Sequence, residues 1–254
     1  MSAFLGALRY EFCMQLRRRS VWVSIGFALV LLFALFSRSG PPERVLPPAD
    51  TALRLVGNAS FFLPVAFGIL LADRWRRERS LGTLELLDSL PASLGARLWG
   101  KYFGATIATM IPLLLAFALF MLYSGVRIGD ATLVRFLPLI FVVVIAPGLL
   151  FVAAFSIACT EWLPVPLYAV LFTGYWFWGN LVPPERMPTL NCTLLTPIGE
   201  YPAAAFFQHT DVGCFNGQSI PIALGLASIA LLLATGALAL FALQAYITRR
   251  AAAR

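Results

Sequence analysis

Long apolar intervals without charge are the feature that most constrains how this chain can fold. They lie at Ser20–Ser37, Leu55–Ala72, Tyr102–Val126, Phe136–Thr160, Trp162–Pro184 and Val212–Thr248, the last with an apolar core at about Ile220–Ile247. Each interval can supply the roughly 17–25 residues that an α-helix needs to cross a bilayer. Over the whole chain 60% of residues are hydrophobic and 12% are charged, whereas a soluble domain is nearer a quarter charged. The sequence therefore predicts an all-α membrane protein, with six transmembrane helices in a single domain over residues 1–254.

Arginine and lysine are distributed unevenly over the segments that connect these intervals. If the N-terminus lies inside the cell, the inner segments hold thirteen of these residues and the outer segments hold six. Cytoplasmic segments of membrane proteins carry the excess of positive charge. We therefore expect a multi-pass protein of the inner (plasma) membrane with both termini in the cytoplasm. The net charge of +7 follows from this orientation, and no nucleic-acid-binding motif accompanies it.

Residues 1–19 do not resemble a secretory signal peptide, because the arginines follow the apolar part instead of preceding it. An apolar set falls near one helical face, and a polar set lies largely away from it: Phe4, Leu5, Leu8, Phe12 and Leu16 against Arg9, Glu11, Gln15 and Arg17. This pattern predicts an amphipathic helix lying in the membrane interface. A plain N-terminal flank to the first span is the alternative.

The segment 73–101 is the most strongly charged part of the chain, with six basic and four acidic side chains. It must lie in water, because charge is costly in hydrocarbon. Within it Thr83 can cap a short helix, Glu85 lies in the first turn and Pro91 ends it. Leucines recur along one side of this helix: Leu81, Leu84, Leu87 and Leu90, with Leu86 beside them. The apolar stripe predicts a docking element, whereas the arginines alone favour a helix resting on lipid headgroups.

The outer segment 185–219 is long and semi-apolar, with short helical stretches too brief to cross the membrane. The predicted topology separates the four cysteines, because Cys13 and Cys159 face the cytoplasm while Cys192 and Cys214 share this outer segment. Since the outer side is oxidising, we expect a Cys192–Cys214 disulfide that holds the segment as a lid. Two buried free thiols are the alternative.

Several possible sites are disfavoured by their surroundings. Gly95–Lys101 fits the Gly-x4-Gly-Lys spacing of a phosphate-binding loop, but Tyr102 replaces the expected Ser or Thr and no strand precedes it. His209 is the only histidine and has no Cys/His cluster beside it, so we expect no metal site. The predicted spans contain no Asp, Glu, Lys, Arg or His, which disfavours a proton-coupled carrier and an in-membrane hydrolase. We expect no catalytic site, and energy would come from another chain.

The charged segment resembles the first cytoplasmic loop of ABC type-2 transporter permeases. The pattern is an acid at Glu78, then Gly-Thr-Leu-Glu-Leu-Leu at residues 82–87, then Leu-Pro, and later Gly100-Lys101 opening a span. Arg9-Tyr-Glu11, followed by the basic residues 17–19, is similar to the amphipathic connector helix of that family. The resemblance implies the permease subunit of an ATP-driven ABC transporter, in a family that mostly exports.

The resemblance also implies partners. The permease would dimerise with itself or with a second permease chain, and it would dock a separate ABC ATP-binding subunit through a coupling helix at Thr83–Leu90. The residues implied in this coupling are Glu78, Leu81, Gly82, Thr83, Leu84, Glu85, Leu86, Leu87 and Pro91. ATP and magnesium would bind to the partner ATPase, and no cofactor is expected in this chain. Membrane lipid is the remaining expected partner.

A second hypothesis comes from another class of protein. The chain could be a membrane scaffold or assembly subunit of an envelope complex, without transport of its own. A neighbouring gene that encodes a P-loop ATPase would favour the permease. A neighbouring envelope assembly factor, with no ATPase nearby, would favour the scaffold.

The predicted topology can be tested by cysteine accessibility. In a background without Cys13 and Cys159, an Arg254→Cys variant should react with a membrane-impermeant thiol reagent only after the cells are opened. A Thr132→Cys variant, in the predicted outer turn, should react in intact cells and is the positive control. Labelling of position 254 from outside intact cells would contradict the topology.

Overall fold

A computed structural model describes residues 3–39, 48–80, 93–130, 132–182, 186–208, 214–215 and 217–252. Every regular element in these ranges is helical, which confirms the all-α fold class for them. In chain order the elements are α1 (Ala3–Leu16), α2 (Arg19–Ser39), α3 (Pro48–Ser80), α5 (Leu94–Ile128), α6 (Leu133–Ile140), the π-helix η1 (Phe141–Ile145), α7 (Ala146–Cys159), α8 (Val165–Leu181), α9 (Glu200–Phe207) and α10 (Ile222–Ala252).

Within the described residues, three helical stretches are long and apolar enough to cross a membrane. They are Leu94–Ile128, Leu133–Cys159 and Ile222–Arg250. They correspond to the predicted spans 102–126, 136–160 and 220–247. Helices α2, α3 and α8 overlap the other three predicted spans, 20–37, 55–72 and 162–184. The chain is therefore a multi-pass membrane protein, and the count of six spans stays a prediction.

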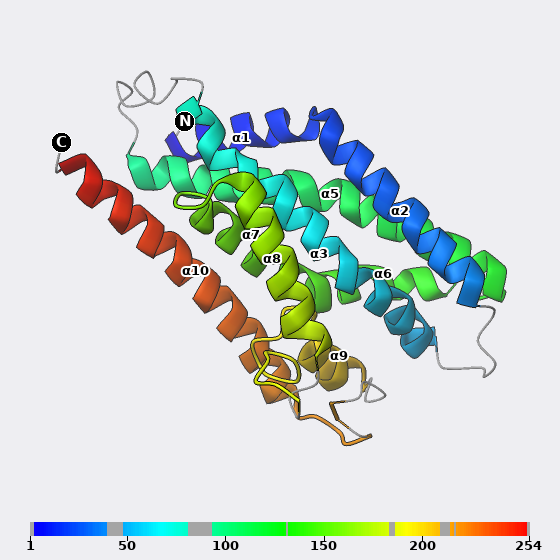
Figure 1. Cartoon of the computed structure of the whole chain (residues 1–254). Coiled ribbons are helices and arrows are strands. Elements are labelled where there is room, and N and C mark those ends of the chain that lie inside the picture. Colours follow the sequence, from blue (N-terminus) through cyan, green and yellow to red (C-terminus); the bar gives the residue numbers. More distant parts are fainter. Residues whose placement is uncertain are drawn as a thin grey trace.

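The long helices lie beside one another in an elongated bundle (Figure 1). Helix α3 packs on α7 and α8, α2 packs on α5, and α10 packs on α7 and α9. The apolar core between α3, α5 and α7 includes Phe67, Phe117 and Leu149. Both chain termini lie at one end of the bundle, and α9 lies at the other (Figure 1).

The helix α3 does not stop where its apolar interval stops. It continues through the charged residues 73–80 to Ser80, and α5 already begins at Leu94. Both ends of the predicted segment 73–101 are therefore helical, so α3 and α5 extend beyond the apolar intervals 55–72 and 102–126. The physical reason is that charge limits how deep a segment lies in hydrocarbon but does not end a helix. Residues 73–80 contain no glycine or proline, and arginine and glutamate are good helix formers.

The backbone near the proline inside α3 is supported by a neighbouring helix. Pro64 lies inside α3 and cannot donate a backbone hydrogen bond. Beside it, the Trp176 ring N–H on α8 donates to the Phe61 carbonyl oxygen at 2.7 Å. Trp176 is buried against α3 by the same contact. A neighbouring helix thus helps satisfy backbone close to the proline, as hydrocarbon surroundings require.

The segment 186–208, which contains α9, packs directly on the bundle. A side-chain carbon on Gly148 of α7 would collide with the Pro197 carbonyl oxygen, and one on Gly199 would collide with Val144 of η1. Gly199 also has φ of 87°, in the left-handed region that favours glycine. The Ser228 hydroxyl of α10 donates to the Leu194 carbonyl oxygen at 2.8 Å. The irregular backbone of this segment is therefore held by protein.

A disulfide joins Cys192 and Cys214, whose Cα atoms lie 5.4 Å apart. It brackets the short helix α9, and the Tyr201 hydroxyl donates to the Cys192 carbonyl oxygen at 3.3 Å. Cys13 and Cys159 are free thiols. The structure therefore has the same pairing that the sequence analysis expects from the topology.

Removing this crosslink should destabilise the protein. The double substitution Cys192→Ser/Cys214→Ser should lower the free energy of unfolding by about 3 kcal/mol, because the disulfide closes a loop across 22 residues. Thermal unfolding in detergent measures the change, and Cys13→Ser, at an exposed thiol, is the matched control. Recovery of Cys192 and Cys214 as free thiols from non-reduced protein would contradict the crosslink.

Candidate functional site

The predicted coupling helix, Thr83–Leu90, lies in the sequence between α3 and α5, within residues 81–92, which we call the coupling segment. Residues 81–92 lie outside the described residues, and with them Leu81, Gly82, Thr83, Leu84, Glu85, Leu86, Leu87 and Pro91. Glu78 lies in the last turns of α3. The Ser93 side chain accepts a hydrogen bond from the Ala96 backbone N–H at 3.3 Å and caps the start of α5. The structure thus describes the two helical stems of the coupling segment.

The helix α1 lies against the first turns of α5. Two glycines one helical turn apart, Gly100 and Gly104, make this close approach possible. A side-chain carbon on Gly100 would lie 2.8 Å from Ala7, and one on Gly104 would lie 2.6 Å from the Leu8 carbonyl oxygen. The phenyl rings of Phe4 and Phe103 meet edge to face beside this crossing. The pair of glycines therefore fixes α1 on α5.

A buried charged cluster ties α1 to both stems of the coupling segment. The Glu11 carboxylate of α1 lies 3.9 Å from an Arg74 guanidinium nitrogen of α3 and 3.6 Å from the Lys101 ammonium of α5. The Lys101 ammonium also donates to the Arg74 carbonyl oxygen at 3.4 Å. All three residues are at most 4% exposed. We call Glu11, Arg74 and Lys101 the stem cluster.

The stem cluster continues along α1 as a polar contact with α5. The Gln15 side-chain amide donates to the Thr109 hydroxyl at 2.9 Å, and that hydroxyl donates to the Ala105 carbonyl oxygen. Gln15 is fully buried. The prediction that the polar side chains of this helix all lie away from its packed face is therefore wrong in part. Glu11 and Gln15 face the protein and Leu5 is exposed, because the partners on α3 and α5 are themselves charged or polar.

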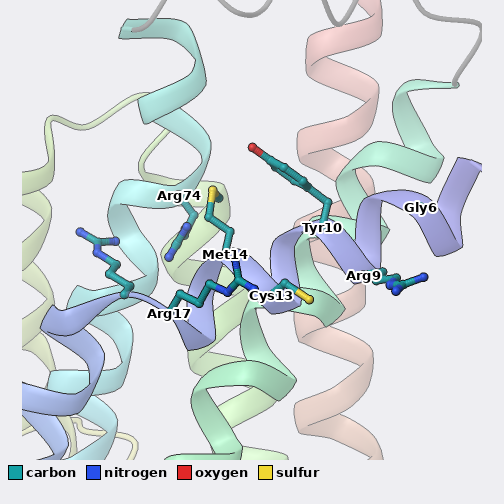
Figure 2. Close-up of a pocket in the computed structure, with 8 residues that line it drawn as sticks. Gly6, Arg9, Tyr10, Cys13, Met14, Arg17 and Arg74 are labelled. Atoms are coloured by element: carbon teal, nitrogen blue, oxygen red, sulfur yellow. The ribbon is translucent and has the colours of Figure 1, made fainter.

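The outward face of α1 forms an open pocket of about 700 Å³ (Figure 2). Its lining combines arginines with an aromatic ring and two sulfur side chains: Gly6, Arg9, Tyr10, Cys13, Met14, Arg17, Arg18 and Arg74. Tyr10 and Met14 rise from the same side of α1, with Arg74 of α3 near Met14 (Figure 2). The pocket therefore lies on the side of α1 that faces away from α5.

The remaining candidate sites carry no catalytic arrangement among the described residues. Cys192, Glu200 and Cys214 lie close enough to hold a metal ion, but the two sulfurs are bonded to each other and leave no thiolate. Burial raises the pKa of the Glu200 carboxyl, and a hydrogen bond with the Cys192 backbone partly opposes this. Gly95–Lys101 lies on α5, without the loop that phosphate binding requires. His209 lies outside the described residues.

Sequence reasoning missed the stem cluster, although signals for it were present. Arg74 and Lys101 each lie at the edge of an apolar interval and were counted only as charges that orient the chain. Gly100 and Gly104 have the small-xxx-small spacing of close helix contacts. Glu11 and Gln15 are one helical turn apart, so they share a face of α1. Only the contact with α3 and α5 shows that this face is buried.

Neutralising the centre of the stem cluster should destabilise the protein. The Glu11→Gln substitution should lower the free energy of unfolding by about 3–5 kcal/mol, because Arg74 and Lys101 then stay buried without their carboxylate. Asp130→Asn, at the exposed turn after α5, is the matched control and should change it by less than about 1 kcal/mol. Thermal unfolding in detergent measures both. Equal midpoints for the two variants would contradict a stabilising cluster.

Comparison with known proteins assigns a family to this arrangement. The sequence matches the family described as ABC-2 family transporter protein over residues 7–177, about two thirds of the chain. The matched range begins within α1, includes α3, the coupling segment and α5, and ends in α8. No curated protein matches the chain. The protein thus belongs to the ABC-2 family of transporter proteins, which are membrane components of ABC transporters.

Proposed function

We propose that this chain is the membrane-spanning permease subunit of an ATP-driven ABC exporter. The family supports a transport role, because its members are the membrane components of such transporters. In this proposal ATP and magnesium bind to a separate ABC ATP-binding subunit, and this chain performs no hydrolysis. The observation that carries the proposal is the stem cluster, which links α1 to both helices that flank the coupling segment.

The coupling segment 81–92 is the proposed point of contact with the ATPase. Thr83–Leu90 forms the coupling helix, with Leu84 and Leu87 as apolar anchors and Glu85 as the polar contact. A displacement of this helix would reach α3 and α5 together, because Glu11 holds Arg74 of one stem and Lys101 of the other. The glycine contact with α1 would make the three helices move as one body.

The membrane arrangement in this proposal has six spans, with both termini in the cytoplasm. The position of both termini at one end of the bundle supports an even number of crossings (Figure 1). A second permease chain, identical or different, completes the transporter. The substrate path lies at the interface between the two, lined by apolar and weakly polar side chains, since the predicted spans carry no charge. An apolar or amphipathic substrate fits such a path best.

The coupling role can be tested with a substitution in the leucine stripe. Leu87→Asp should weaken association with the ATPase more than tenfold, because burying one leucine contributes about 1.5–3 kcal/mol. Transport should fall with it, while insertion of the permease into the membrane stays unchanged. Copurification of the ATPase and transport by reconstituted vesicles are the measurements.

Ser89→Asp is the matched control, because it adds the same charge to the segment without removing a leucine. It should retain ATPase copurification and transport. If Leu87→Asp leaves both association and transport unaltered, this helix has no part in the mechanism.

A further inference from the structure

We propose that the outward face of α1 is a binding site for the phosphate group of an anionic membrane lipid. The site is the open pocket lined by Arg9, Arg17, Arg18 and Arg74, with Tyr10 and Met14 between the arginines (Figure 2). This inference goes beyond the permease function, because it concerns neither the coupling segment nor the transport path.

The spacing of the lining residues builds two adjacent rows along α1 and Arg17, which directly follows it and whose backbone N–H donates to the Cys13 carbonyl oxygen at 3.2 Å. Arg9, Cys13 and Arg17 follow one another at intervals of four residues, and so do Tyr10 and Met14 in the neighbouring row. Residues four apart lie on the same helix face. One row therefore presents two guanidinium groups and the other an apolar strip. Arg9 and Arg17 are both exposed, and the site depends chiefly on these two.

Guanidinium groups recognise phosphate well, because their planar N–H groups match its oxygens in pairs. Basic pockets at the cytoplasmic ends of membrane helices bind the headgroups of anionic lipids in the same way. Arg74 of α3 also lines the pocket but is paired with Glu11 in the stem cluster, so the positive charge that a headgroup meets comes chiefly from Arg9 and Arg17. No acidic residue is among the lining residues that the structure describes. The pocket therefore favours an anion.

The apolar strip identifies the anion as part of a lipid instead of a soluble ion. Tyr10 is 66% exposed, and Met14, one helical turn further along, is also exposed. A soluble phosphate ion makes no apolar contact with these side chains, whereas the glycerol and upper acyl carbons of a lipid would cover them. The strip leads toward α2, where the Trp22 ring N–H donates to the Leu16 carbonyl oxygen at 2.8 Å and the exposed ring stands at the junction. Tryptophan is typical of the membrane interface.

Native mass spectrometry of the full chain in detergent tests the proposal without any ATPase or transport. The wild type should bind phosphatidylglycerol in preference to phosphatidylcholine of the same chain length. Each arginine near an anionic headgroup contributes about fivefold in affinity, so Arg9→Gln/Arg17→Gln should weaken binding of phosphatidylglycerol about 25-fold. Arg135→Gln/Arg249→Gln removes the same charge at exposed positions outside the pocket and should keep wild-type binding. Equal binding by the two double variants would overturn the proposal.

The exposed thiol of Cys13, between Arg9 and Arg17, gives a second measurement on the otherwise unchanged chain. In nanodiscs, phosphatidylglycerol should slow its alkylation by an uncharged maleimide several-fold relative to phosphatidylcholine alone. Arg9→Gln/Arg17→Gln should abolish this difference. Equal protection by inorganic phosphate or ATP in the absence of anionic lipid would overturn the lipid as the occupant. Protection that appears only when the ATP-binding subunit is added would overturn it in favour of a protein contact.

Discussion

At the end of the bundle where both chain termini lie (Figure 1), the structure depends on the buried carboxylate of Glu11. It lies between Arg74 and Lys101, which enter from the two helices that flank the coupling segment. Two cations buried at this depth need a nearby anion, because an uncompensated buried charge is strongly destabilising. The glycines of α5 allow α1 to come close enough to supply that anion. The position of α1 and the charge balance of the two stems therefore depend on the same contact, in which Glu11 faces both Arg74 and Lys101.

The opposite end of the bundle is held by different physical means. There the chain leaves regular helix for a long stretch, and its backbone polar groups need partners away from bulk water. The glycines at 148 and 199 let the segment touch α7 and η1, and Ser228 binds it from α10. The Cys192–Cys214 disulfide then restricts the segment in the unfolded as well as the folded chain. A charged contact stabilises the end where the termini lie, and close packing with a crosslink stabilises the end that contains α9.

Most of the fold could be predicted because hydrocarbon imposes strong and local rules on sequence. A charge-free apolar interval of sufficient length predicts a helix from its own residues, and each of the six predicted intervals overlaps a helix of the structure. The ends of those helices were less predictable. Residues 73–80 are charged and still helical, since hydropathy reports the environment of a segment and not its backbone conformation. The disulfide was predictable because the predicted topology places Cys192 and Cys214 in one connecting segment, apart from Cys13 and Cys159.

The amino-acid sequence by itself determined the all-α class, the positions of the long helices, the family and the cysteine pair, because each depends on local composition or on an ordered motif. Only the tertiary structure decided which face of α1 is buried. A glutamate and a glutamine on an amphipathic helix are polar by every local rule, and those rules place them in water. Contacts with Arg74, Lys101 and Thr109, which lie about 60 to 95 positions away, reverse that preference. The pocket on the other face of α1 has the same cause, because burial of Glu11 and Gln15 leaves Arg9, Tyr10 and Arg17 facing outward.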